Sequence, residues 1–198
     1  MPSAAGGVSL ASAPAYHIST ILRLFIERLL RRQDPKLLDV GPICAENINL
    51  LARQTARLYV CDMFIRIDRE RERTGALRSV WRHLDYPDKS FDGILLWDLL
   101  DRLDDSDVAS LLERCHSILK QGGMLVVFFF GEQGGQESVN SFIIEDEGYR
   151  VSTRAQAHLK LPLRRRNARD ILDMLSSFRL VKSVICGNGL REFLLQRM

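Results

Sequence analysis

Two residues whose chemistry suits a nucleotide-type cofactor stand near the start of the chain. Gly41 ends the strand-like run at residues 36–41, and Asp62 ends a second such run at residues 58–62. A glycine lets a ligand approach the backbone closely. A carboxylate one strand further along can accept hydrogen bonds from ribose hydroxyls. The separation between Asp39 and Asp62 fits one strand–helix–strand unit, so both residues are expected at the carboxyl edge of a parallel sheet, where open α/β folds bind ligands.

The elements that must position these residues follow from the apolar pattern of the chain. Short runs rich in strand-forming residues alternate with segments in which apolar residues recur every three or four positions. This alternation predicts a parallel sheet with helical crossovers. The expected strands lie at residues 37–41, 58–62, 78–84, 91–97 and 124–130, and the expected helices at residues 46–54 and 105–119.

The last part of the chain departs from this alternation. Residues 180–186 and 190–196 are strand-like and are joined by a short Gly/Asn link, which predicts an antiparallel hairpin. The predicted fold class is therefore α/β, with a Rossmann-like, mostly parallel sheet of seven strands, helices on both faces and a C-terminal antiparallel hairpin.

One domain is expected, at residues 16–198. Residues 1–15 are rich in Ala, Ser, Gly and Pro, which predicts a flexible tail and not a signal peptide. Residues 16–33 predict an amphipathic helix capped by Ser19 or Thr20 and ended before Pro35. This helix could close over a ligand as a lid or pack on the sheet, and the pattern leaves both alternatives open.

The composition bounds the function. Of the 198 residues, 46% are apolar and 27% are charged, as in an ordinary globular protein. The net charge of +3 is too small to imply nucleic acid as a partner. The four cysteines form no Cys-x-x-Cys pair, so neither a disulfide framework nor a metal site is expected, and reduced thiols fit a cytoplasmic protein. No apolar run approaches the length of about 18 residues that a membrane-spanning helix needs, so no membrane span is expected.

The order of these elements resembles that of the class I S-adenosylmethionine-dependent methyltransferases. The resemblance covers about residues 36–130 and 169–197. Residues 37–41 (LLDVG) look like the family's first strand, and residues 85–92 (DYPDKSFD) are similar to its "LPFPDGSFD" segment. Residues 97–103 (WDLLDRL) match "SEVLHHL" in register, and residues 119–125 (LKQGGML) look like "LKPGGxL".

The resemblance implies S-adenosylmethionine as cofactor and assigns it four candidate site residues. Asp62 falls where the family's ribose-binding acid sits, and Gly41 is the residue of closest approach. Asp39 would hold the turn and the cofactor amino group, or only stabilise the turn. Asp98 falls on the family's acidic position after the fourth strand, although it also begins an acidic stretch that suits a helix start. No catalytic residue is assigned.

The first turn departs from the family pattern. Where the family has Gly-x-Gly-x-Gly, residues 41–45 read GPICA, so only the first glycine is present. Ile43 adds a Cβ that restricts φ and takes space, and Pro42 removes a backbone donor. The family's acidic residue near the adenine has no clear counterpart either. The sequence therefore leaves open whether the turn at residues 41–45 still admits the cofactor.

The function expected from these observations is S-adenosylmethionine-dependent methyl transfer to a small-molecule acceptor. Residues 131–167 are the least family-like and are expected to build acceptor specificity. Their arginines could bind an anion, but no aromatic residues interleave with them, so nucleic acid is not expected as a partner. The alternative is a non-catalytic protein that keeps the fold as a binding or interaction module. A nicotinamide oxidoreductase is disfavoured, because Ile43 and Glu46 stand where its glycine fingerprint needs glycines.

Overall fold

The computed structural model describes residues 16–77, 80–131, 137–145, 148–187 and 189–198. The tail predicted at residues 1–15 lies outside the described residues. A central sheet has the strand order β3-β2-β4-β5-β9-β8. The first four of these strands are parallel, whereas β9 runs antiparallel to both β5 and β8. These strands are β2 (Lys36–Asp39), β3 (Arg57–Val60), β4 (Phe91–Trp97), β5 (Leu119–Phe130), β8 (Arg179–Ile185) and β9 (Leu190–Gln196).

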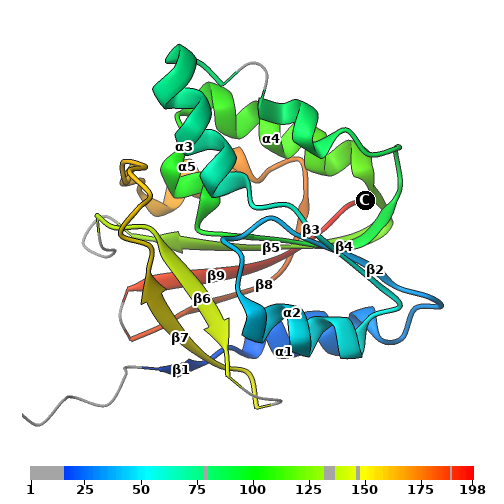
Figure 1. The fold of residues 1–198 in the computed structure, drawn as a ribbon. Helices are drawn as coiled ribbons and strands as arrows, with labels where there is room; N and C mark the ends of the chain where they lie inside the picture. The colour runs from blue at the N-terminus through cyan, green and yellow to red at the C-terminus, as the bar shows by residue number, and fades with distance from the viewer. Residues whose placement is uncertain (1–15, 78–79, 132–136, 146–147, 188) are drawn as a thin grey trace, which may run out of the picture.

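Helices cover both faces of this sheet, as Figure 1 shows. One face carries α1 (Thr20–Leu29) and α2 (Ala45–Gln54). The other carries α3 (Met63–Thr74), α4 (Asp105–Ile118) and α5 (Ala168–Met174). The α/β class, the parallel core and the C-terminal antiparallel hairpin are confirmed. None of the helices within the described ranges combines the length and the apolarity that a membrane span requires.

The predicted sheet of seven strands is wrong by one strand. The strand expected at residues 78–84 is instead a 3₁₀ helix, η1 (Val80–Leu84), and residues 78–79 lie outside the described part. Only Val80 and Leu84 are buried within η1. Arg82, midway between them, is exposed, whereas a half-buried strand would place it on the same face as Val80 and Leu84. Within the described residues the sheet therefore has six strands, with β3 at its edge.

The N-terminal amphipathic helix packs on the sheet. Ser19 caps α1, because its hydroxyl accepts a hydrogen bond from the backbone N–H of Leu22 at 3.0 Å. Five apolar side chains of α1 are fully buried, and the ring of Phe25 lies against Gly93 of β4. A Cβ at Gly93 would stand 2.5 Å from that ring, so the glycine lets the helix approach the sheet closely. The structure thus supports the packing alternative for this helix.

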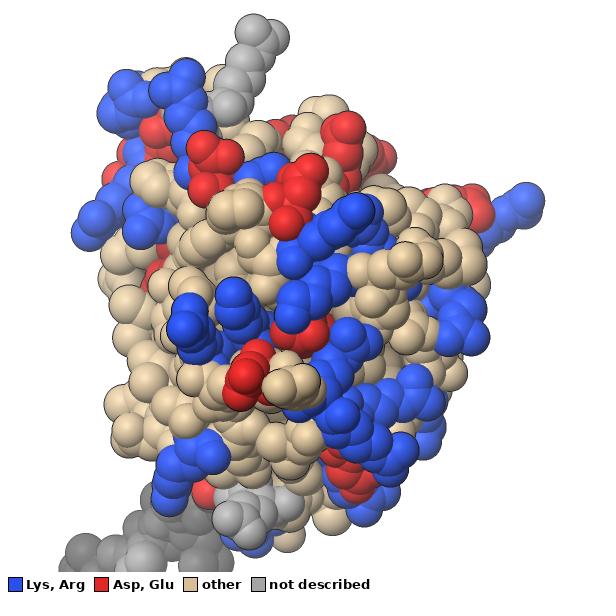
Figure 2. All heavy atoms as spheres, turned by 90° about the vertical axis from the view of Figure 1, so that its right-hand side faces the viewer, with Lys and Arg blue, Asp and Glu red and all other residues tan. Residues whose placement is uncertain are grey.

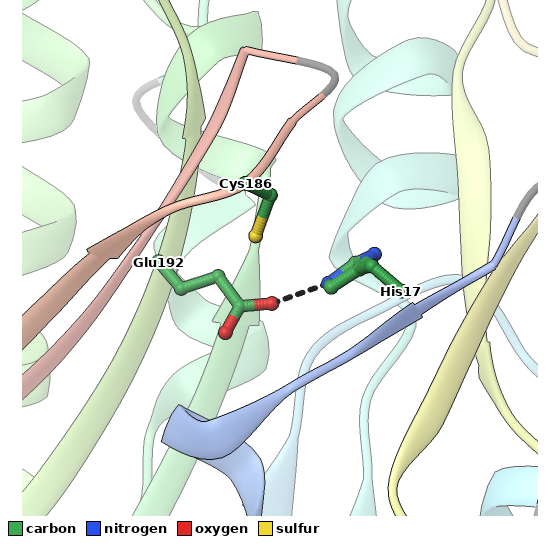
Figure 3. A group of neighbouring side chains, drawn as sticks. All are labelled: His17, Cys186 and Glu192. Carbon is green, nitrogen blue, oxygen red and sulfur yellow. Dashed lines mark hydrogen bonds and ion pairs between the residues drawn. The ribbon is translucent and has the colours of Figure 1, made fainter.

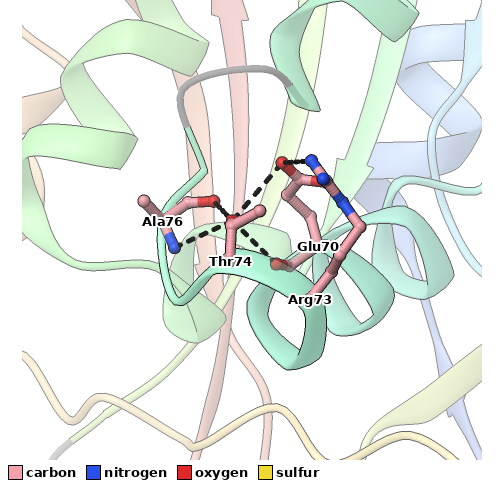
Figure 4. A network of polar contacts seen from close by, with 4 residues as sticks. All are labelled: Glu70, Arg73, Thr74 and Ala76. Atoms are coloured by element: carbon pink, nitrogen blue, oxygen red, sulfur yellow. Dashed lines mark hydrogen bonds and ion pairs between the residues drawn. The ribbon is translucent and has the colours of Figure 1, made fainter.

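The helix α3 follows β3 directly. Asp62 caps its first turn, and it ends at Gly75, whose φ of 71° needs a glycine. Figure 4 shows the end of this helix, where the hydroxyl of Thr74 lies 3.0 Å from the carbonyl oxygen of Glu70 and accepts from the N–H of Ala76. Arg73 pairs with Glu70 at 2.9 Å. These contacts fix the helix that begins directly at the predicted ribose-binding residue.

A second, smaller sheet has the order β1-β7-β6 and lies beside the ends of the central strands (Figure 1). All its pairings are antiparallel. It combines β1 (His17–Ile18) with β6 (Asn140–Ile144) and β7 (Arg150–Ala155) from the segment expected to build acceptor specificity. Residues of β6 and β7 share one buried apolar cluster with α1 and the central sheet.

Candidate functional site

The structure brings Gly41 and Asp62 to the same edge of the sheet. Asp39 ends β2 and pairs in register with Val60, which ends the neighbouring parallel strand β3. The two chain segments that leave these strands meet directly, because Oδ2 of Asp62 accepts a hydrogen bond from the N–H of Ile43 at 3.1 Å. The carboxyl edge of β2 and β3 therefore holds a backbone turn beside a carboxylate.

Asp62 has a structural role in addition to any ligand it binds. Its Oδ1 accepts from the backbone N–H of Ile65 at 3.0 Å, which caps α3. Each carboxylate oxygen thus has one backbone partner, and the residue is half-buried. An ionised carboxylate offers about four acceptor positions, so Asp62 retains capacity for hydroxyl donors. Ile43, in the same turn, is 66% exposed and does not fill the space beside the strands.

The space beside Gly41 is filled by Trp97, the last residue of β4. A Cβ at Gly41 would lie 2.4 Å from Cδ1 and 2.5 Å from Nε1 of the indole. Those distances are far below any real carbon contact, so only glycine permits the ring to lie there. The sequence predicted that a ligand approaches Gly41 closely, but the side chain of Trp97 occupies that position.

An aromatic cluster holds this indole in place. Trp97 stacks on Phe142 of β6, with ring centroids 5.8 Å apart and an interplanar angle of 5°. Its edge meets Phe128 of β5 at 5.4 Å, and Phe128 also contacts Phe142. Trp97 is 2% exposed and its φ is 53°, a left-handed conformation that a bulky residue adopts only where its surroundings impose it. The packing of Trp97 therefore compensates for local backbone strain.

Asp39 links the turn to the indole. Its Oδ1 accepts from the N–H of Gly41 at 2.9 Å and from Nε1 of Trp97 at 2.7 Å. Burial raises the pKa of Asp39 to about 6; the hydrogen bonds from Trp97 and Gly41 oppose this shift, while the charge of Asp62 adds to it. Asp39 thus stabilises the turn, which was one of the two roles expected for it.

Asp98, the residue after Trp97, lies inside the protein. It is fully buried and pairs with Arg102, whose Nη2 lies 3.1 Å from Oδ2. Burial raises the pKa of Asp98, and the Arg102 charge opposes that shift. Arg102 also donates to the carbonyl oxygens of Glu137, Ser138 and Leu161. Asp98 therefore anchors the segment that follows β5.

Polar contacts at the start of α2 hold β6 over this edge. The side chain of Asn47 donates to the carbonyl of Phe142 and accepts from the N–H of Ile144, both at 2.8 Å. Glu46 pairs with Arg154 of β7 at 2.6 Å, and that hydrogen bond is the largest cause that lowers the pKa of Glu46 to about 2. The small sheet is therefore fastened to the helix that follows the Gly41 turn.

The sequence did not identify Trp97, Phe142 or Arg102 as parts of this region. The sequence did contain a signal for Trp97. The apolar strand ends in this large aromatic residue, directly before an acidic residue, and that position places the ring at the end of the strand. No local signal existed for Phe142, because it reaches the cluster from a different sheet. Arg102 stood four positions after Asp98, a spacing at which opposite charges meet on a helical turn.

The arginines of residues 150–169 are largely engaged with acidic groups. Arg166 is 6% exposed and pairs with Asp105 at 2.8 Å. Arg154 pairs with Glu46, and Arg165 lies 3.9 Å from Glu137. The opposite side of the molecule, which faces the viewer in Figure 2, likewise has Asp and Glu side chains among its groups of Lys and Arg. These pairings weaken the anion-binding alternative for this segment.

The comparisons with solved structures support the fold. The chain is 15% identical to the 1,6-didemethyltoxoflavin-N1-methyltransferase of Burkholderia thailandensis, which was crystallised with 1,6-didemethyltoxoflavin and S-adenosylhomocysteine. The match covers 90% of this chain and 79% of that one, with a TM-score of 0.55. A SAM-dependent methyltransferase of Aquifex aeolicus matches at 14% identity and a TM-score of 0.54, over 89% and 92% of the two chains. The [4+2]-cyclase SpnF matches at 17% identity and a TM-score of 0.52, over 89% and 79%.

Because these structures share at most 17% identity with the chain, they show its fold alone. The assignment to a family rests on a family model. No curated protein matches the chain. The model described as "Methyltransferase domain" matches residues 15–140, which is more than half of the chain and includes both strand ends of the candidate site. The chain therefore belongs to the methyltransferase domain family, whose methyl donor and cofactor is S-adenosylmethionine.

Proposed function

We propose that this chain transfers the methyl group of S-adenosylmethionine to a small-molecule acceptor. The observation that carries the proposal is the meeting of the Gly41 turn with Asp62 at the carboxyl edge of β2 and β3, in a chain of this family. Asp62 would accept hydrogen bonds from the ribose hydroxyls, and the backbone at Gly41 would lie nearest the methionine part. Asp98 has no part in the proposal, because Arg102 holds its buried carboxylate.

The cofactor fits one half of this edge and not the other. Asp62 is half-buried and keeps unused acceptor positions. At Gly41 the indole of Trp97 lies where the ligand would approach. Binding therefore requires the indole to leave Gly41 and to give up its hydrogen bond to Asp39 and its stacking on Phe142.

Methyl transfer asks little of the remaining side chains. The sulfonium supplies a good, neutral leaving group when the cofactor is bound. The protein then mainly holds the acceptor in line with the methyl group, and a base is needed only where the acceptor arrives protonated. The segment of residues 131–167, which includes β6 and β7 at this edge, would position the acceptor. A small molecule is favoured because the arginines of this segment are paired internally, and because the toxoflavin methyltransferase of similar fold is named for such an acceptor.

A second candidate function follows from Trp97. The indole, the aromatic cluster and the Asn47 contacts close the edge as part of the core. A chain with a permanently closed edge would keep the methyltransferase fold as a binding or interaction module. The fold alone does not decide between the two candidates, since the similar chain SpnF is named as a cyclase.

Titration with S-adenosylhomocysteine by calorimetry separates the two candidates. The variant Asp62→Asn keeps the oxygen that caps α3, but it places an amide donor where Oδ2 accepts from the N–H of Ile43. It therefore removes the contact to the turn and the acceptor for the ribose together, while sparing the helix cap. We expect micromolar binding by the wild-type chain and at least about tenfold weaker binding by this variant, the loss of a hydrogen bond to a charged group. Asp104→Asn is the matched control, because Asp104 caps α4 in the same way.

Trp97→Ala tests whether the indole must leave Gly41 before the cofactor can bind. Binding by this variant but not by the wild-type chain would mean that the site exists and is closed. Absence of binding in both would reject the methyltransferase proposal in favour of the interaction module. Formation of S-adenosylhomocysteine with a panel of small heterocycles, against oligonucleotides and peptides, then tests the class of acceptor.

A further inference from the structure

Glu192 of β9 is a buried carboxylate on an apolar face of the sheet. Its neighbours on the same face, Leu190 and Leu194, belong to the buried cluster that packs against α1. Glu192 itself has no exposed surface. An ionised carboxylate in such a place is costly unless a cation or strong donors compensate for it. The groups around Glu192 therefore decide what this position is for.

Two polar side chains from the start of the described chain reach Glu192. Nε2 of His17 lies 2.6 Å from Oε1, and the hydroxyl of Ser19 donates to Oε2 at 2.7 Å. Ser19 is itself fixed as the cap of α1. The carboxylate is thus oriented with one oxygen bound to the helix start and the other turned towards the imidazole.

Cys186 completes a group of three metal-ligating side chains. Figure 3 shows the thiol, the carboxylate and the imidazole pointing toward one another from the end of β8, from β9 and from β1. In the part of the chain that the structure describes, the ligand atoms of Cys186, His17 and Glu192 all lie within 4.8 Å of one another. Cys186 and His17 are partly exposed, whereas Glu192 is buried, so an ion can enter from the solvent side.

We propose that His17, Cys186 and Glu192 bind a divalent transition metal of the zinc type. Imidazole nitrogen, thiolate sulfur and carboxylate oxygen are the donors that Zn²⁺ takes in proteins, and three protein ligands leave a fourth position for water. Ser19 supplies the outer hydrogen bond that orients a ligating carboxylate in such sites.

The geometry requires only small movements. Bonds of about 2.0–2.3 Å in a tetrahedral site separate the ligand atoms by about 3.3–3.8 Å. The contact between His17 and Glu192 must open from 2.6 Å, with the metal replacing the proton that they share, while Sγ of Cys186 moves inward. The bound ion would fasten β1, and with it the small sheet that pairs with β1, to the C-terminal hairpin.

The sequence did not predict a metal site, because no metal-binding spacing links these residues. His17 and Glu192 are 175 positions apart, and only the fold unites them. The inference does not depend on methyl transfer, since it concerns the opposite end of the strand order from β3. Its test therefore uses metal binding and not activity.

The experiment titrates the metal-stripped chain with Zn²⁺ in competition with a chromophoric chelator, and with Co²⁺ followed by absorption. We expect one equivalent of either metal to bind, with a thiolate-to-cobalt charge-transfer band and tetrahedral d–d bands. Cys186→Ser should abolish the charge-transfer band. Cys186→Ser and His17→Gln should each weaken Zn²⁺ binding more than about tenfold, since loss of an outer partner alone costs that much.

Matched controls are Cys44→Ser and His158→Gln, which remove a thiol and an exposed imidazole outside the group. Both should bind like the wild-type chain. Thermal unfolding gives a second readout, since Zn²⁺ should raise the melting temperature of the wild-type chain and not that of Cys186→Ser. No stoichiometric binding by the wild-type chain would overturn the proposal. Binding that Cys186→Ser and His17→Gln leave unchanged would also overturn it.

Discussion

The two halves of the carboxyl edge are built differently. At the ends of β2 and β3, Asp62 is half-buried and Ile43 is exposed, whereas Gly41 is buried beneath Trp97. At the ends of β4 and β5, the large side chains Trp97 and Arg102 are buried and hold other segments in place. The first half keeps a partly exposed carboxylate, whereas the second half is core and covers Gly41 through Trp97. The family match includes both halves, although they differ in what they leave accessible.

The largest effect is expected from removal of the cation in the buried half. Arg102→Met leaves Asp98 fully buried without its partner. Breaking a buried ion pair in this way costs about 3–5 kcal/mol, and we expect that loss in the free energy of unfolding measured with urea. Arg73→Met, at an exposed pair with Glu70, is the control and should change stability by less than about 1 kcal/mol. An equally small effect at Arg102 would show that the second half is not core.

The pH dependence of stability tests the burial of Asp39 beneath Trp97. Its pKa is raised from 3.8 to about 6 in the folded chain, so the folded state binds its proton more tightly than the unfolded state. That contribution is fully present below pH 3.8 and is lost as the pH rises through about 6, with an upper size of about 3 kcal/mol. Asp39→Asn keeps an oxygen for both donors, which bond the same Oδ1, and removes the titration.

The measurement is the difference in unfolding free energy between Asp39→Asn and the wild-type chain at several pH values. The variant should gain on the wild-type chain as the pH rises from about 4 to 6. A difference that stays constant over this range would mean that Asp39 is not desolvated by the closed indole. Asp101 belongs to the other half, and its pKa is raised to about 8, mainly by burial. Asp101→Asn should therefore show the same gain extending to about pH 8.

The smallest expected effect concerns the strand that covers the edge. Asn47→Ala removes both hydrogen bonds that tie α2 to β6, at a cost of about 1–3 kcal/mol. Amide hydrogen exchange should become faster at Ile144, whose N–H loses its side-chain acceptor, and remain slow at Leu194 in the central sheet. Equal acceleration at both positions would contradict a local fastening of β6.

The sequence predicted the layers of the fold better than the state of the site. Alternating strands and helices, the Ser19 cap and the Gly/Asn hairpin are local patterns, and the structure bears them out. The strand expected at residues 78–84 is wrong, because residues 80–84 form a 3₁₀ helix in which Arg82 is exposed between the buried Val80 and Leu84. The Gly41 turn and Asp62 were placed at one edge from their spacing alone.

What the sequence could not provide are contacts between distant segments. Phe142 meets Trp97 through a second sheet, and Asn47 binds the backbone of β6. Neither contact leaves a periodic signal, because each depends on how two sheets pack. The same limit applies to His17 and Glu192, which are joined only in the folded chain.

The position of β9 also has a consequence for how the protein is made. Residues 190–196 form an inner strand that pairs with β5 on one side and β8 on the other. During synthesis on the ribosome, the nascent chain cannot complete this sheet until those residues have left the exit tunnel. Before then, the exposed edge of β5 is free to pair with other chains. A folding intermediate that lacks β9 should therefore associate with other chains through β5 more readily than the folded protein does.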